Sequence, residues 1–240
     1  MTFTILASDP TRGLLAAATA SRSLAVGAGV PAIRVGVGAA ASQAYTNRAL
    51  RGRLLDALEG GETPASALQR IPEWDGESEK RQAAVISFDG EAAAHTGATC
   101  SAWAGSETGE GFVVAGNLLP GPEVLSAMSA AFLAEADGVV STDGDSADDG
   151  AGDTERPGDA EAALAAFASR VLAALAAGDA AGGDSRGRQS AALLVGAGER
   201  PKTGEAPLAI DLRADDHTAP IAELGRLLEL AIAERRAAAE

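Results

Sequence analysis

Thr2 is the first residue of the chain whose chemistry could amount to catalysis. Removal of Met1, which is expected when the second residue is as small as threonine, would give Thr2 a free α-amino group beside its hydroxyl. A hydroxyl is a weak nucleophile at neutral pH, but an α-amine has a pKa of about 7.7–8.0 and can accept the hydroxyl proton. The alternative is that Thr2 is only a β-branched residue that opens a strand.

A second polar cluster occupies the glycine-rich stretch from Gly182 to Ser190. Its glycines would let the backbone approach a ligand, and Asp184 and Arg188 add an acceptor and donors just before an apolar strand. The stretch is not a P-loop, because Gly-Lys-Ser/Thr is absent. The alternative is a structural turn in which Asp184 pairs with Arg186 or Arg188.

Other polar residues stand at the ends of predicted strands. Ser42 and Gln43 could supply an oxyanion hole or cap the helix that follows, and Asn117 could line the same cleft. Arg22 and Arg34 could place positive charge near Thr2. Because arginine stays protonated, it can bind a carboxylate but cannot act as a base.

No spacing of histidine, cysteine or carboxylate residues resembles a metal site. His95 and His217 lie far apart in sequence, and Cys100 is near only the first. A single cysteine cannot form an intramolecular disulfide, which is typical of a reducing compartment. We therefore expect neither a metal nor an organic cofactor.

The pattern of apolar runs, turns and helical spacing predicts a mixed α+β protein. Strands are expected at 2–8, 14–20, 35–42, 83–88, 92–96, 112–115, 191–195 and 208–212, and helices at 50–58, from 64, from 122, at 164–178 and at 221–232. Two hairpins are indicated, one of them by Asp89-Gly90. The glycines in 35–42 predict close approach of another backbone, and Gly178 is expected to end its helix.

The segment 137–159 differs from the rest of the chain. Asp, Gly, Ser and Thr dominate it, and it has too little apolar surface to offset the cost of ordering. We expect a disordered acidic insertion within a single domain. A partner-binding acidic loop is the alternative.

The composition restricts the class of protein. The net charge of −15 argues against nucleic-acid binding, which needs a basic surface. No apolar run is expected to reach the roughly 18 residues that cross a bilayer, and the start lacks the features of a signal peptide, so a cytoplasmic protein without a membrane partner is expected. Lysine occurs only as Lys80 and Lys202, which favours a salt-adapted, halophilic protein or a coding bias.

Long and unusually composed motifs resemble the DUF1028 family. They begin at Thr2 with TFTILASDPTRGLLAAATASRSLAVGAGVP and continue as VGVGAAASQAYTN, HTGATCSAWAG, GNLLPGPEV, AGGDSRGRQSAALLV and IDLRADDH. Outside the acidic segment the resemblance covers nearly the whole chain.

The resemblance implies the fold of the Ntn hydrolases, a four-layer αββα sandwich of two mainly antiparallel sheets between helices. It places Thr2 where that fold has its nucleophile, and it makes Asp184 and Ser190 counterparts of residues that orient the N-terminal amine. The chain departs from the proteasome-like pattern, because residues 14–20 contain no carboxylate and no lysine precedes Lys80. The α-amine would then have to serve as the base.

These observations lead to two alternative functions. The first is an amidohydrolase that cleaves a small amide or short peptide, with Arg22, Arg34 or Arg188 available for a substrate carboxylate. The second is a non-catalytic Ntn fold used for ligand binding or assembly. Related folds form rings, so a homo-oligomer is a further possibility.

Overall fold

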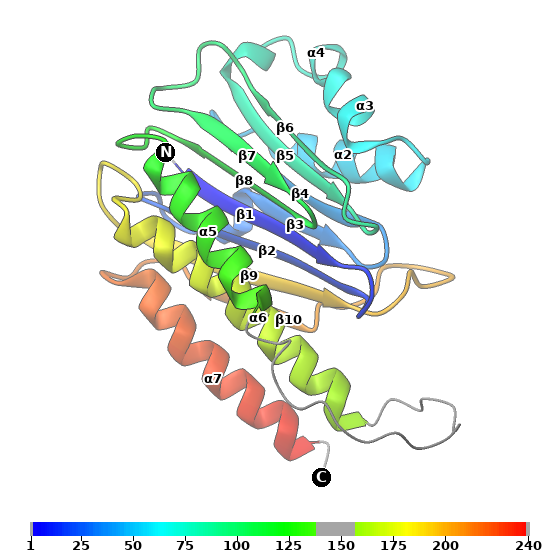
Figure 1. Ribbon diagram of the computed structural model, residues 1–240. Helices are drawn as coiled ribbons and strands as arrows, with labels where there is room; N and C mark the ends of the chain where they lie inside the picture. The colour runs from blue at the N-terminus through cyan, green and yellow to red at the C-terminus, as the bar shows by residue number, and fades with distance from the viewer. Residues whose placement is uncertain (1, 138–156, 239–240) are drawn as a thin grey trace.

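The computed structural model describes residues 2–137 and 157–238, which form two antiparallel sheets with helices on their outer faces (Figure 1). The strands are β1 (Thr2–Asp9), β2 (Leu14–Ser21), β3 (Pro31–Arg34), β4 (Gly38–Ala44), β5 (Arg81–Ser87), β6 (Ala92–Thr96), β7 (Gly105–Gly109), β8 (Phe112–Asn117), β9 (Ser190–Ala197) and β10 (Ile210–Ala214). The helices are α1 (Val26–Gly29), α2 (Ala49–Glu59), α3 (Pro64–Gln69), α4 (Ile71–Trp74), α5 (Glu123–Asp137), α6 (Pro157–Ala180) and α7 (Pro220–Ala238), with a 3₁₀ turn η1 (Ser78–Lys80).

Strand order places the amino-terminal strand in the middle of the larger sheet. That sheet has six strands in the order β10-β9-β2-β1-β8-β7, and the smaller sheet has four in the order β3-β4-β5-β6. Every neighbouring pair is antiparallel, and β1 lies between β2 and β8. The predicted α+β class, the amino-terminal hairpin and the β5–β6 hairpin at Asp89-Gly90 are confirmed.

Alternation along β1 explains how the larger sheet can pack on both faces. Phe3 and Ile5 point to α5, α6 and α7, whereas Leu6 points to the smaller sheet. The side chains buried between the two sheets are mostly small: Leu6, Ala17, Val26, Val30, Ala39, Ala41, Ala84, Ile86, Val113 and Ala115. The outer face of the smaller sheet packs on α2 and α3 through Leu50, Leu54 and Leu68. The elements therefore form a layer of helices, two sheets, and a second layer of helices (Figure 1).

The glycines around β4 behave as predicted, because other backbones lie against them. A Cβ on Gly38 would stand 2.4 Å from the carbonyl oxygen of Ile86 and 2.7 Å from Leu58 Cδ1. Gly36 has φ +70, and a Cβ there would stand 2.1 Å from the backbone nitrogen of Arg200. The expected strand 35–42 is displaced, since β4 begins at Gly38 and the preceding three residues form its turn from β3.

Two strands were not predicted, and both lie at sheet edges. β3 is four residues long and opens with Pro31, and β7 has the sequence GSETG, which carries no apolar alternation. Edge strands bury little, so their sequences need not show the pattern of a core strand.

The sequence suggested that Gly178 ends α6, but the helix continues to Ala180. A Cβ on Gly178 would stand 2.6 Å from Met128 Cγ. The glycine therefore lets α5 and α6 pack closely, which is a tertiary requirement and not a helix stop.

The predicted insertion at 137–159 falls largely outside the described residues. At its margins the structure differs from the expectation, since Asp137 ends α5 and residues 157–159 begin α6.

The expectation that no apolar run could cross a bilayer is corrected by α6. Its segment Gly158–Ala180 is 23 residues long and contains an 18-residue window with a mean hydropathy of 1.5, which meets the length and composition of a membrane span. Alanine supplies much of this hydropathy. The helix packs on β1, β2 and β9 and on the two neighbouring helices, in the manner of a core helix.

We expect Gly38→Ala to lower the free energy of unfolding by about 1–3 kcal/mol, because the added methyl group would overlap a neighbouring backbone carbonyl. Gly52→Ala is the matched control, since Gly52 is the fourth residue of α2 and nothing lies within 4 Å of its Cβ position. That change should raise stability by about 0.5–1 kcal/mol. Urea unfolding of both variants measures the difference, and equal effects would contradict the close-approach argument.

Candidate functional site

Thr2 opens the central strand, and its neighbours on both sides are polar. Asn117 is its cross-strand partner on β8, and the Thr2 hydroxyl donates to Ser21 Oγ on β2 over 3.3 Å. Because Phe3 faces the helices, the Thr2 side chain lies on the face turned toward the smaller sheet. Thr2 is buried, with 6% of its surface exposed.

The glycine-rich stretch Gly182–Ser190 passes across this end of the larger sheet, and we call it the 182–190 loop. Ser185 Oγ donates to the carbonyl of Leu118, just after β8, over 2.9 Å. Asp184 Oδ2 accepts the backbone N–H of Arg22, just after β2, over 2.7 Å. Thr2 lies on the strand between β2 and β8, so the loop spans the two strands that flank it.

Asp184 and Ser190 hold this loop by hydrogen bonds to backbone groups. Asp184 Oδ1 also accepts the backbone N–H of Arg186 at 2.9 Å, and the Arg186 guanidinium lies 3.0 Å from Oδ2. Ser190 Oγ accepts the N–H of Val26 at 3.0 Å and donates to a backbone carbonyl, that of Ser23. The structural turn in which Asp184 pairs with Arg186 is therefore present in the protein.

Beneath Thr2, buried polar side chains connect the two sheets. Thr4 Oγ1 lies 2.8 Å from Thr19 Oγ1 and 2.7 Å from Gln43 Oε1. Gln43 Nε2 donates to Gln82 Oε1 at 2.8 Å, and Asn117 Nδ2 donates to the same oxygen at 3.0 Å. We call these five side chains the inter-sheet network.

The amides of Gln43 and Asn117 are used by the network to different extents. Both Gln43 Nε2 hydrogens are used, one on Gln82 and one on the carbonyl of Ala115 at 3.2 Å. Asn117 Nδ2 uses one hydrogen on Gln82, and no partner for the second is found among the described residues. Asn117 Nδ2 therefore has one hydrogen without a partner among the described residues, whereas both hydrogens of Gln43 Nε2 serve the interior.

Ser42 does not lie at this site, although the sequence suggested it for an oxyanion hole. It alternates with Gln43 along β4, so its side chain faces the α2 and α3 layer. Its backbone N–H bonds the carbonyl of Val30 at 3.1 Å, and its buried Oγ has no partner among the described residues.

The three candidate arginines separate in space. Arg22 directly follows Ser21, and its Nη1 donates to Gln189 Oε1 at 2.9 Å. Arg188 lies in the 182–190 loop and pairs with Asp179 at 2.8 Å, not with Asp184.

Arg34 is placed away from Thr2. It ends β3 at the turn into β4, the opposite end from Gln43, and pairs there with Asp56 and Glu59. The pairing register of β3 with β4, which no local sequence signal reveals, places Arg34 at the end of β4 opposite Gln43.

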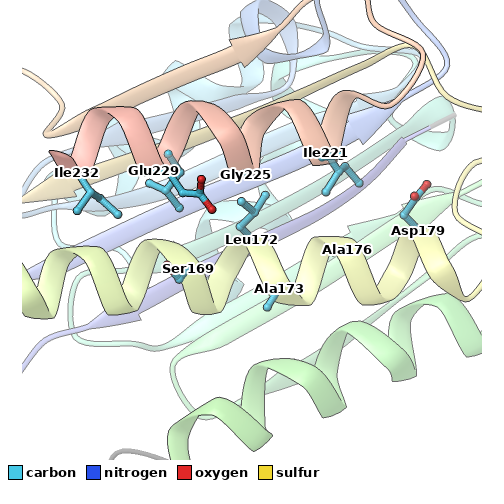
Figure 2. A pocket seen from close by; sticks show the side chains of 11 residues that line it. Ser169, Leu172, Ala173, Ala176, Asp179, Ile221, Gly225, Glu229 and Ile232 are labelled. Carbon is cyan, nitrogen blue, oxygen red and sulfur yellow. The ribbon is translucent and has the colours of Figure 1, made fainter. Parts of the chain in front are cut away.

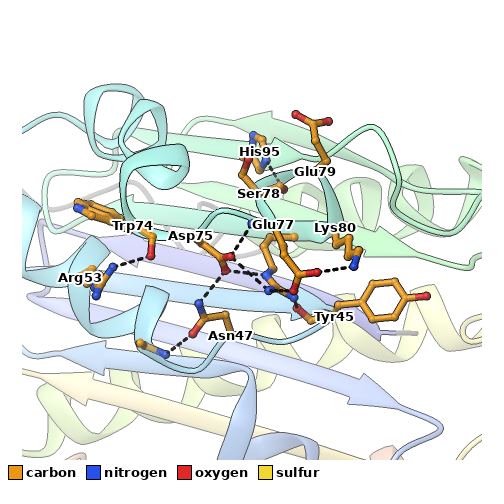
Figure 3. A network of polar contacts seen from close by, with 12 residues as sticks. Tyr45, Asn47, Arg53, Trp74, Asp75, Glu77, Ser78, Glu79, Lys80 and His95 are labelled. Carbon is orange, nitrogen blue, oxygen red and sulfur yellow. Dashed lines mark hydrogen bonds and ion pairs between the residues drawn. The ribbon is translucent and has the colours of Figure 1, made fainter.

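Another polar cluster, centred on Asp75, holds the segment after β4 against the segment before β5 (Figure 3). Asp75 Oδ2 accepts from Arg81 Nε and from Asn47 Nδ2, each at 2.7 Å, and Asp75 Oδ1 accepts the N–H of Glu77 at 2.9 Å. Arg81 also donates to the carbonyl of Tyr45 at 2.7 Å. The hydrogen bond from Arg81 holds the pKa of Asp75 well below its usual range, against the opposing effect of burial. Since Gln82 follows Arg81, this cluster lies next to the member of the inter-sheet network on β5.

The histidines and the cysteine do not gather into a metal site in the part of the chain that the structure describes. The described residues contain no group of three His, Cys, Asp or Glu side chains that could hold a metal ion. His95 Nε2 lies 3.2 Å from the carbonyl of Ser78, and burial raises the pKa of the Cys100 thiol. Neither residue is arranged as a base or an activated nucleophile.

The 480 Å³ hollow between α6 and α7 lies in the outer helix layer (Figure 2). Leu172 of α6 and Ile221 and Ile232 of α7 point into it, and its lining is mainly apolar. It contains none of the residues that surround Thr2.

The geometry defines a class: an α+β protein of two packed antiparallel sheets, with a threonine at the start of the central strand beside a glycine-rich loop. The chain matches the family described as "Family of unknown function (DUF1028)" over residues 2–224 and belongs to that family. A crystal structure of a DUF1028 protein from Silicibacter pomeroyi is similar, with a TM-score of 0.75 and 32% identity over 96% of this chain and 85% of that chain. Among curated proteins, no match to the chain is found.

The sequence did not single out four polar residues near Thr2, which are Thr4, Thr19, Ser21 and Gln82. Each is a polar residue at an alternating position of an otherwise apolar strand, which is the one signal that could have indicated them. Their convergence depends on how the two sheets stack.

We expect Asp75→Asn to lower the free energy of unfolding by about 1–3 kcal/mol at neutral pH, because Arg81 loses its buried charge partner. The depressed pKa of Asp75 means that its stabilisation is fully present above its ordinary pKa of about 3.9 and is lost as the pH falls below that value. Urea unfolding at a series of pH values should therefore show the difference from the parent protein shrinking toward about pH 3.

Glu223→Gln is the control for this experiment. Glu223 is paired with Arg226 on an exposed helix face, so its removal should leave stability nearly unchanged. A D75N difference that stays constant with pH would contradict the assigned role of the carboxylate.

Proposed function

We propose that the chain is an N-terminal-nucleophile amidohydrolase with an Ntn-hydrolase-like αββα fold, in which Thr2 attacks a small amide or short peptide. The observation that carries the proposal is the position of Thr2. It begins the central strand, between Ser21 and Asn117, at the sheet end crossed by the 182–190 loop. A strand in the middle of a sheet is a rigid support, as a nucleophile requires.

The proposed reaction uses groups that Thr2 itself supplies once Met1 is removed. Thr2 Oγ1 forms a bond to the acyl carbon while its proton passes to the α-amine, and the proton then moves to the leaving nitrogen as the C–N bond breaks. Water attacks the resulting ester, giving its proton to the amine. Breakage of the ester releases the carboxylic acid and restores the threonine hydroxyl.

The surroundings supply positioning in this scheme. Ser21 Oγ holds the Thr2 hydroxyl, and the second N–H of Asn117 is available for the oxyanion. Asp184 and Ser190 position the loop through backbone hydrogen bonds.

A second candidate, a non-catalytic binding or assembly module, is favoured by two observations. Thr2 is 6% exposed, and Asp184 is occupied by two backbone N–H groups and by Arg186. In that case the polar end of the sheet would bind a ligand without cleaving it, in a monomer or in a homo-oligomer.

Thr2→Ala should abolish hydrolysis of an amide panel and labelling by a threonine-directed acylating probe, while Thr2→Ser should retain both. Intact mass should show that the active protein lacks Met1 and gains a single acyl group. Persistence of Met1 in active protein, or unchanged activity in T2A, would overturn the proposal. Absence of labelling in the folded parent protein at low and at high salt would favour the binding module.

Asn117→Ala should slow acylation by about 10²–10³-fold, the usual cost of losing one oxyanion donor. Asn47→Ala is the matched control, because its amide bonds Asp75 and is not paired with Thr2. Rates of probe labelling, compared at temperatures where circular dichroism shows both variants folded, separate the two. Equal loss in both variants would point to a structural effect.

A further inference from the structure

A second hollow, of about 400 Å³, lies beside the proposed site, and we call it the Arg22 hollow. Its lining comes from three segments: the residue after β2, the end of the 182–190 loop, and the connection from β10 to α7. The lining residues are Arg22, Arg188, Gln189, Asp216, His217 and Thr218. We infer that this hollow binds a carboxylate and that the substrate is a carboxylate-bearing amide; the second part rests on the proposed function.

Arg22 carries a positive charge that is held in place but is not neutralised by a carboxylate among the described residues. Its backbone N–H bonds Asp184, and its Nη1 bonds Gln189 Oε1 at 2.9 Å. Gln189 is held in turn, since its Nε2 donates to Asp216 Oδ1 at 3.1 Å. Among the described residues no carboxylate pairs with the Arg22 guanidinium, so most of its five N–H donors remain for a ligand.

The other groups of the hollow add donors. Arg188 contributes a guanidinium that shares its charge with Asp179. His217 Nδ1 accepts the backbone N–H of Ala219 at 3.0 Å, so the neutral ring carries its proton on Nε2. Nε2–H is then a donor.

The amino-terminal end of α7 lies next to this hollow. Thr218 lines it two residues before Pro220, the first residue of the helix. The first bond of this helix is from Glu223 N–H to the carbonyl of Ala219, so the N–H groups of Ile221 and Ala222 have no acceptor within the helix. Helix starts of this length carry partial positive charge, which favours an anion.

The acidic groups nearby are already engaged. Asp216 accepts from Gln189, and Asp184 accepts from Arg22 and Arg186. Asp179 neutralises Arg188, and Asp216 accepts from a neutral amide and keeps its charge, so among the described residues the guanidinium of Arg22 is the group of this hollow that offers an unpaired positive charge to an anion. A planar carboxylate, which guanidinium groups bind in a two-pronged way, fits these donors.

The hollow lies at the end of the larger sheet that carries Thr2. Arg22 follows Ser21, and Ser21 Oγ receives the Thr2 hydroxyl. Because β1 and β2 are neighbouring strands, a carboxylate held at Arg22 would lie at the same sheet end as Thr2.

Isothermal titration of the Met1-processed protein tests the inference with N-acetylglycine, N-acetylglycinamide and inorganic phosphate. We expect N-acetylglycine to bind and the neutral amide not to bind. Arg22→Gln should weaken binding about tenfold or more, since charge-assisted hydrogen bonds are lost. Arg12→Gln, an exposed arginine at the β1–β2 turn paired with Asp9, should leave it unchanged.

The inference would be overturned by no binding of N-acetylglycine, by equal binding of its neutral amide, or by equal loss in R12Q and R22Q. Phosphate binding as tightly as the carboxylate would also overturn it, in favour of a general anion site. If R22Q fails to fold, Arg188→Gln takes its place with the same expected direction.

The Thr2→Ala variant separates this inference from the proposed function. Retained N-acetylglycine binding in T2A, with no hydrolysis by the parent protein, would leave the carboxylate site standing and reject the hydrolase. Hydrolysis that shows no preference for carboxylate-bearing amides and no change in R22Q would do the reverse.

Discussion

The side-chain amide of Gln82 is the interaction on which the arrangement of the two sheets depends. It is fully buried on β5, yet its oxygen accepts from Gln43 and from Asn117, and its nitrogen donates to the carbonyl of Gly116 at 2.8 Å. A buried amide without partners is costly, so these bonds fix how β4, β5 and β8 lie relative to one another. Asn117 is the cross-strand partner of Thr2, and the same amide therefore sets the environment of the amino-terminal strand.

The rest of the space between the sheets is filled by small side chains. Alanines from both sheets meet there, Ala17 and Ala115 from the larger sheet and Ala39, Ala41 and Ala84 from the smaller one. Such a layer gains less hydrophobic free energy per side chain than a layer of leucines, and it leaves little room for a change of volume. Polar bonds at one end of this thin layer then have a large share in fixing the register. The larger apolar side chains, including Phe3, Phe132 and Met128, are concentrated on the opposite face of the six-stranded sheet, under the helices.

The 182–190 loop shows how one sequence motif can serve two purposes. Its Asp184 and Ser185 attach it to the chain after β2 and after β8, on either side of Thr2. Each bond goes to a backbone group, so it positions the loop whatever chemistry follows. The same loop carries Arg188 and Gln189 to the edge of the Arg22 hollow. Structural anchoring and ligand binding are therefore compatible in this segment, and they need not be alternatives.

Local sequence determined the features that depend on neighbours in the chain. Apolar runs and the turns between them placed β1, β2, β5 and β6 to within two residues, helical spacing located α2 and α7, and the long motifs indicated the family. Thr2 and the 182–190 loop stood out because their residue types are unusual where they occur. Edge strands β3 and β7 were not predicted, because a strand that buries few side chains needs no alternation of apolar and polar residues.

Tertiary structure decided everything that depends on which face meets which element. Ser42 and Gln43 are adjacent and equally polar, yet one turns to the α2 layer and the other to the inter-sheet network. Arg22 and Arg34 were equivalent as cations, but strand direction carried them to opposite ends. A strand reverses its facing at every residue, and a hairpin reverses its direction. Register and sheet stacking, which arise from contacts far apart in the chain, therefore select the residues that can share a site.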